Sequence, residues 1–336
     1  MKFTLQAPLL LSLALFAAGT SAQVSLDAQI DYEVSGYFND SATTPVNQRV
    51  NNSMSIELEV FSAWDNDNQS ITFKPFFRQD EMDDERTHGD IRELMWNKLS
   101  DDYELKVGLG KVFWGVTESA HLVDIINQTD SVESIDGEQK LGQPMVQVLL
   151  EREWGNLDLF VLPYFRERTF SGKGARLSAG FDYADAVYES SDKESNIDVA
   201  ARLSHYWDEL EYAVSVFHGT SRELSLGFNA LTGEAIPYYP VISQLGVELQ
   251  YLDEGWAWKF ESIYRDGAPE NSISAFGQNF AVLNVGQGLN VADSEGYFAT
   301  AAGFEYTQVG IWETRIDLGW VVEHIYDSRQ EKASFG

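Results

Sequence analysis

The sequence predicts an all-β fold, an antiparallel transmembrane β-barrel, from three observations. Segments in which apolar and polar residues alternate recur along the whole chain, and a period of two is the pattern of a strand because successive side chains point to opposite faces. The connections between these segments alternate between short turns and long loops. Aromatic residues crowd the short turns, as they do at the edges of a membrane-spanning barrel.

The hairpin over 197–218 shows the pattern best. On its first limb Ile197, Val199 and Leu203 share one face, while Asp198 and Arg202 lie on the other. The connection over 207–209 is too short for anything but a hairpin turn. Each limb has roughly the nine to eleven residues that cross a bilayer as a tilted strand.

The N-terminus carries the features of a secretory signal. Lys2 supplies a positive start, an apolar core follows over 9–18, and small residues over 20–22 form a cleavage site. We therefore expect residues 1–22 to be a signal peptide and the barrel to occupy 23–336. An uncleaved anchor helix is the alternative, but the apolar run is shorter than the roughly 20 residues that a span needs.

The mature chain contains about thirteen alternating segments, in order of sequence. They cover 24–38, 54–60, 71–78, 91–99, 103–109, 145–153, 157–164, 197–205, 210–218, 245–251, 256–260, 296–306 and 311–322. Pro75 cannot donate to a ladder, so it predicts a bulge or a strand end. Bacterial single-chain barrels have an even number of strands, so we expect about 14 to 16 in the complete barrel and a truncated C-terminus.

Composition narrows the possible partners. The 336 residues carry a formal net charge of −30 and include no Cys. This acidity argues against nucleic-acid binding, and the scattered His and absent Cys argue against a metal site or disulfides. We expect no cofactor. The acidic loops are either a solvated surface or partners for the divalent cations that bridge lipopolysaccharide.

This layout resembles Gram-negative porin-type outer-membrane proteins over the whole mature chain. The resemblance is architectural, and no family motif is matched residue by residue. It implies a location in the outer membrane of a Gram-negative bacterium, contact with outer-membrane lipid and lipopolysaccharide, passage of small polar solutes, and a homotrimer.

The segment 111–144 differs from the other loops because it is rich in apolar residues such as Trp114, Val123 and Ile126. We expect it to fold into the lumen as a constriction loop, with a cover over the barrel mouth as the alternative. Together with His121, its acidic residues would then line the pore: Glu118, Asp124, Asp130, Glu133, Asp136 and Glu138.

Alternation also predicts which wall charges face the lumen. The basic set is Lys74, Arg78, Lys106, Arg202, Lys259 and Arg315. Acidic residues on the same faces outnumber these, and charged rings tune which ions pass, so a mild cation preference is expected. Each single charge has a simpler explanation as half of an ion pair within the wall.

The leading hypothesis is a water-filled channel for passive diffusion of small polar solutes. A hydrolase barrel is a second hypothesis, since Ser119, His121 and Asp124 are the residue types of a catalytic triad. Triads are recognised by geometry, and closeness in sequence is weak support. A structural sleeve or an adhesin with partner-binding loops is the third.

Overall fold

A computed structural model describes residues 2–16, 23–41, 48–134, 136–223, 225–229, 231–269, 272–275, 278–281, 283–284, 294–308 and 318–329. Only the backbone is described for 2–16, 23, 272–275, 278–281, 283–284 and 318. Its strands are β1 (Lys2–Phe16), β2 (Gln23–Tyr37), β3 (Val50–Trp64), β4 (Gln69–Asp80), β5 (His88–Leu99), β6 (Glu104–Gly110), β7 (Gln143–Arg152), β8 (Gly155–Leu162), β9 (Val187–Tyr188), β10 (Asp198–Trp207), β11 (Leu210–Thr220), β12 (Ser225–Asn229), β13 (Glu234–Tyr239), β14 (Val241–Asp253), β15 (Trp256–Pro269), β16 (Ser272–Ala275), β17 (Gln278–Ala281), β18 (Leu283–Asn284), β19 (Ser294–Gln308) and β20 (Leu318–Asp327). One short 3-10 helix, η1, covers Lys193–Ser195.

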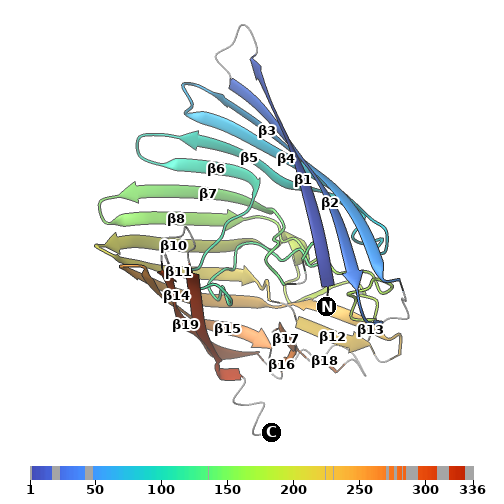
Figure 1. The fold of residues 1–336 in the computed structure, drawn as a ribbon. Helices are drawn as coiled ribbons and strands as arrows, with labels where there is room; N and C mark the ends of the chain where they lie inside the picture. The colour runs from blue at the N-terminus through green and yellow to red at the C-terminus, as the bar shows by residue number, and fades with distance from the viewer. Residues whose placement is uncertain are drawn as a thin grey trace.

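The main sheet has 14 strands in the order β1-β2-β3-β4-β5-β6-β7-β8-β10-β11-β14-β15-β19-β20. Every neighbouring pair in it is antiparallel. Figure 1 shows β5, β6, β7, β8, β10, β11 and β14 stacked in chain order. The thirteen strands of this sheet from β2 onward correspond one to one with the alternating segments of the sequence, so the predicted all-β antiparallel fold is confirmed.

The short turns and the bulge lie where the sequence predicts them. β10 ends at Trp207 and β11 begins at Leu210, so the turn is Asp208 and Glu209. The β4–β5 register shifts between Lys74 and Pro75, which confirms the bulge expected at this proline. Strand β20 runs over 318–327 where 311–322 was expected, and residues 309–317, with Arg315 among them, lie outside the described residues.

The two faces of the main sheet are unlike each other. On the outer face Val214 is 43% exposed and Trp258 is 49% exposed, although both side chains are apolar. The opposite face of the same strands is buried, and it includes Asp198, Ser215 and Glu248. A water-soluble sandwich would bury the apolar face, so this arrangement is inverted relative to a soluble protein.

The buried interior is completed by the insert between β6 and β7. Its residues Trp114, Val123, Ile125 and Ile126 form one apolar cluster with side chains from β5, β7, β8, β10, β11, β14, β15 and β19. Ile126 is fully buried. The sheet therefore curves around the insert, and side chains from eight of its strands belong to the same apolar cluster as the insert.

The long loops carry structure that the alternation pattern did not predict. Segments expected to be plain polar loops over 166–196 and 219–241 contribute β9, β12 and β13, which form a second sheet in the order β18-β12-β13-β9. Phe170 and Tyr183 stack in these loops with ring centroids 3.9 Å apart. The strands of this second sheet are too short to show a sustained alternation, so the sequence alone does not distinguish them from a loop.

The segment expected to be a signal peptide contains β1, which pairs with β2 from Lys2↔Tyr37 to Phe16↔Gln23. Its role as a signal stays a prediction. Within the described residues, no helix is long and apolar enough to cross a bilayer.

Candidate constriction site

The insert over 111–144 is fastened to the inner wall at two opposite places. The first is the carboxylate of Glu261 on β15. It accepts hydrogen bonds from the backbone N–H groups of Val116 at 2.7 Å and Thr117 at 2.8 Å. It also accepts the Thr117 hydroxyl at 2.7 Å and the N–H of Val123 at 3.3 Å. A buried carboxylate with several N–H donors is a strong charge-assisted anchor.

Glu323 on β20 repeats this arrangement one step further along the insert. Its carboxylate accepts the backbone N–H groups of Glu118 at 2.6 Å and Ser119 at 2.9 Å. Lys259, on β15, pairs with Glu118 and with Glu305. The start of the insert is therefore held by carboxylates from the last strands of the sheet.

The other end of the insert is held by arginines from the first half of the sheet. Arg78 on β4 donates to Glu133, with Nη2 2.9 Å from Oε2, and Arg92 on β5 pairs with Asp130. Arg86 donates from Nε to the carbonyl of Val132 at 3.1 Å. The acidic part of the insert thus faces a basic stretch of wall.

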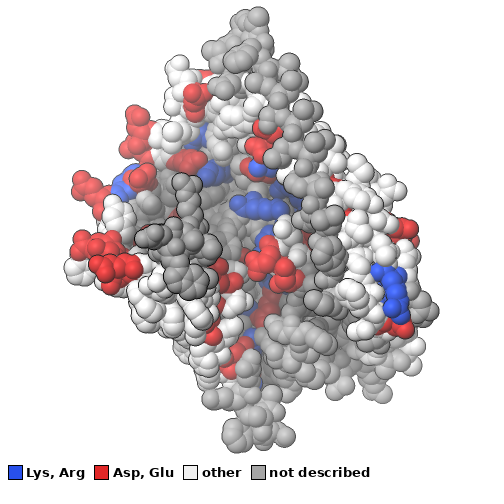
Figure 2. Space-filling view, viewed as in Figure 1, with Lys and Arg blue, Asp and Glu red and all other residues white. Residues whose placement is uncertain are grey.

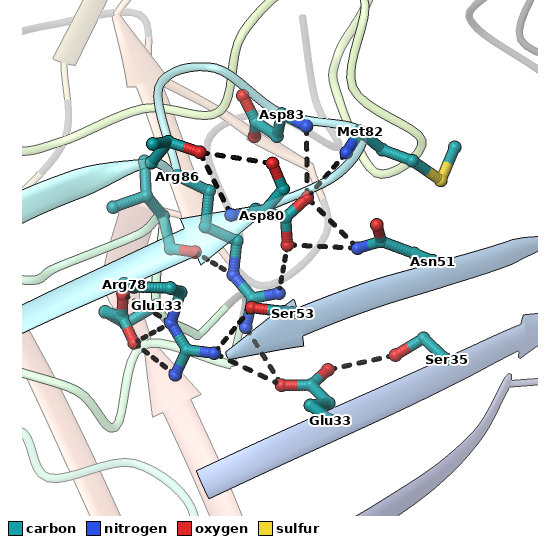
Figure 3. A network of polar contacts seen from close by, with 12 residues as sticks. Glu33, Ser35, Asn51, Ser53, Arg78, Asp80, Met82, Asp83, Arg86 and Glu133 are labelled. Carbon is teal, nitrogen blue, oxygen red and sulfur yellow. Dashed lines mark hydrogen bonds and ion pairs between the residues drawn. The ribbon is translucent and has the colours of Figure 1, made fainter. Parts of the chain in front are cut away.

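A wider polar network continues from these arginines into β2 and β3 (Figure 3). Arg86 bridges Asp80 at 2.8 Å and Glu33 at 3.0 Å. Asn51 donates to Asp80 at 3.0 Å, and Asp80 in turn accepts backbone N–H groups of the β4–β5 loop. Removing one member of this network would leave the other polar groups buried without hydrogen-bond partners.

The predicted pore acids divide into two groups. Asp130 has a fully buried side chain, and Asp124 and Glu133 are almost as enclosed. Each pairs with a basic residue, which for Asp124 is Lys140 at 3.2 Å. The remaining three are exposed: Glu118, Asp136 and Glu138. Only this group is exposed to solvent.

Burial acts on Asp124 more strongly than its partner does. Desolvation raises the pKa of this carboxyl above its ordinary value, while the nearby Lys140 ammonium and the Trp114 N–H at 3.4 Å lower it. Desolvation disfavours the charged form of an acid, which accounts for the direction of the shift.

The predicted wall bases are each paired with a carboxylate. Lys74 lies 2.9 Å from Glu59, Lys106 lies 3.4 Å from Glu104, and Arg202 lies 2.9 Å from Glu248. Arg78 and Lys259 are the insert anchors described above, and Arg315 lies outside the described residues. Both signs of charge gather in and around the hollow at the centre of Figure 2.

The residues of the hypothetical triad are held by other partners. The Ser119 hydroxyl donates to Glu323, and His121 places Nε2 3.5 Å from the Glu138 carboxylate. Asp124 pairs with Lys140. Among the described residues no hydrogen bond joins Ser119 to His121 or His121 to Asp124, so the three do not form a relay.

Several anchors were missed from the sequence. Arg92 follows Ile91 in a segment of weak alternation, and its place on the polar face was the available signal. Arg86 lies in a charged loop, and Glu323 lies one residue past the predicted end of its strand. Nothing in the local sequence of Arg86 or Glu323 distinguishes these two residues from solvated charges. The part of the chain that is described also contains no group of three His, Asp or Glu placed to hold a metal ion.

The sequence matches no protein-family model and no curated protein. In structure the chain is similar to OprB of Pseudomonas putida, solved at high pH, with 10% sequence identity, a TM-score of 0.41, and coverage of 94% of this chain and 80% of OprB. It is also similar to the copper transporter OprC, with 10% identity, a TM-score of 0.35, and coverage of 90% of this chain and 56% of OprC.

Proposed function

We propose that this protein is an outer-membrane channel for passive diffusion of small polar solutes, narrowed by the insert over 111–144. One observation carries the proposal. The insert crosses the concave face of the sheet and is fastened to opposite walls, by Glu261 on one side and Arg92 on the other. A segment fixed in this way narrows the lumen without depending on a partner.

The outer face supports a membrane location. The rings of Trp256 and Trp258 stack with centroids 5.7 Å apart beside the β14–β15 turn, and Tyr306 lies 4.5 Å from Trp256. Aromatic residues at this level of a strand are typical of the boundary between lipid and water. The exposed apolar side chains of the outer face, such as Val214, would then contact acyl chains. The long loops would contact lipopolysaccharide.

The inner face supports a watery lumen. Paired charges such as Arg202 and Glu248 line the wall where a solid core would need apolar side chains. The acids that stay exposed on the insert have no matching excess of exposed bases on it. We therefore propose a mild preference for cations.

Single-channel recording on the purified full-length protein in a planar bilayer tests the proposal. Stepwise conductance is expected, with swelling of proteoliposomes in small sugars and a size cut-off that rises when 116–139 is replaced by a short Gly-Ser linker. Reversal potential in a KCl gradient tests the ion preference. A folded protein that inserts without conducting would exclude the channel, and a clear anion preference would exclude the cation selectivity alone.

A further inference from the structure

Arg168 stands out among the arginines of the interior because no carboxylate neutralises it. It lies in the loop after β8, beside the insert, where Asp130 and Thr169 form a parallel bridge. In the described part of the chain its side chain meets only neutral acceptors. These are Gln128 Oε1 at 3.3 Å, Thr129 Oγ1 at 3.4 Å and the carbonyl of Arg222 at 3.1 Å.

The carboxylates close to Arg168 are engaged elsewhere. Glu167, the preceding residue, accepts the hydroxyl of Tyr188 at 2.5 Å. Asp198 pairs with Arg222, and Glu223 is shared by Arg265 and Arg329. The Arg168 guanidinium therefore makes no ion pair within the described residues, and Glu223 acts on it only at longer range.

The neighbours of Arg168 add donors that have no acceptor. Gln128 Nε2 and Arg222 Nη2 are both buried and make no hydrogen bond to the protein. The Gln128 amide is in contact with Arg168 through its oxygen. The Arg222 guanidinium is fixed by Ile126 O at 3.2 Å and lies over the Phe165 ring at 5.1 Å. Buried donors without acceptors are rare in folded proteins, and each is costly.

We propose that Arg168, with Gln128 and Arg222, forms a binding station for an oxyanion group, the carboxylate or phosphate of a small solute. Nη1 of Arg168 makes no hydrogen bond to the described residues, and its two N–H donors are of the kind that such groups accept. Gln128 and the Arg222 side chain would satisfy the remaining oxygen lone pairs. Arg168 is of intermediate exposure.

The station rests on the proposed channel only for its physiological use. It lies in the loop between β8 and β10, on the same side of the sheet as the insert between β6 and β7. A single such site leaves the overall ion preference to those acids, since Glu118 and Glu138 are each more than half exposed.

Isothermal titration of the folded protein in detergent at low ionic strength tests the station, with inorganic phosphate in one arm and acetate in the other. We expect one saturable site per chain, and the arm that binds more tightly identifies the preferred oxyanion. Arg168→Gln should weaken binding by roughly tenfold or more, the effect of losing a charge-assisted hydrogen bond. Arg168→Lys should bind with intermediate affinity, because it keeps the positive charge and loses the planar guanidinium donors. Lys173→Gln, in the same loop and already paired with Asp182, should bind like the wild type.

Gln128→Glu keeps the acceptor for Arg168 and supplies a carboxylate from the chain itself. It should remain folded and lose anion binding. Absence of saturable binding in both arms, or equal binding by wild type, Arg168→Gln and Gln128→Glu, would mean that water fills the site and would overturn the proposal. Bilayer conductance of the same preparations separates the two proposals, since binding without conductance excludes only the channel, and conductance without binding excludes only the station.

Discussion

The carboxylate of Glu261 on β15 accepts a hydrogen bond from the backbone N–H of Thr117 at 2.8 Å, although 144 residues of chain separate the two. This contact fixes one end of the insert, and the arginines of β4 and β5 fix the other. The insert is therefore held at two places along its length, which limits the conformations that it can adopt.

Glu261→Ala should destabilise the protein by about 2–5 kcal/mol. It leaves the N–H groups of Val116 and Thr117 without an acceptor in a buried place and opens a cavity. Thermal unfolding in detergent followed by circular dichroism measures this, and open-channel noise should rise. Glu153→Ala, at an exposed turn residue, is the matched control. Equal melting of the two variants would show that the anchor is not energetically important.

The Arg92–Asp130 pair should behave as a buried ion pair. Arg92→Leu alone should cost about 3–5 kcal/mol, because it leaves the buried Asp130 carboxylate without its ion-pair partner. Asp130→Leu should cost less, because Arg92 also lies 3.4 Å from Asp90 and 3.8 Å from Glu133. The double variant should recover much of this loss. The exposed pair Lys173–Asp182, put through the same cycle, should show a coupling of about 0–1 kcal/mol. A coupling as small for Arg92–Asp130 would contradict the burial.

The exposed acids of the insert should set the ion preference. The triple variant Glu118→Gln, Asp136→Asn, Glu138→Gln is expected to shift the reversal potential in a KCl gradient toward zero, since it removes three carboxylates from the proposed constriction. The control neutralises three exposed acids of the short turns: Asp208→Asn, Glu209→Gln, Glu254→Gln. An equal shift in both would place selectivity in the total charge and not in the insert.

Asp124 should make stability depend on pH. Its pKa is raised in the folded state, chiefly by burial, so its contribution to stability is fully present below the ordinary carboxyl pKa of about 3.9 and is lost as pH rises through the raised value. Asp124→Asn carries no such charge. Its melting temperature is therefore expected to exceed that of the wild type at pH ~8 and to approach it at pH ~3. A wild type that melts above Asp124→Asn at pH ~8 would instead show that the ion pair with Lys140 outweighs the burial of the carboxylate.

The N-terminal segment should be absent from the exported protein. Intact-mass measurement on protein from outer membranes is expected to give a chain that begins at Gln23, because small residues over 20–22 precede it. Removal of β1 would expose the edge of β2 for new pairing. A mass that includes residues 1–22 would instead make β1 a permanent strand.

Most of the fold was predictable from the local alternation of apolar and polar residues. The alternation of Val214 and Val216 against Ser215 and Phe217 placed the outer and inner faces correctly, and the proline bulge in β4 was confirmed. These features are local because the side-chain direction of a strand depends only on residue parity. The second sheet was missed because β12 and β13 are short and come from a segment with no sustained alternation.

The candidate site was predictable only in outline. The apolar content of 111–144 indicated that this insert packs against something, and Trp114 and Ile126 do pack on the inner wall. Which of its acids stay exposed was not predictable. Asp130 and Glu138 look alike in the sequence, yet one is buried against Arg92 and the other is more than half exposed.

The sequence by itself determined the strands, their order and the face that each side chain takes, because these depend on a period of two and on turns a few residues long. Only the tertiary structure decided which charges neutralise each other and which, like Arg168, remain without a carboxylate. The reason is that ion pairing depends on distances of a few ångströms between residues far apart in the chain, and those distances exist only once the sheet has curved around the insert.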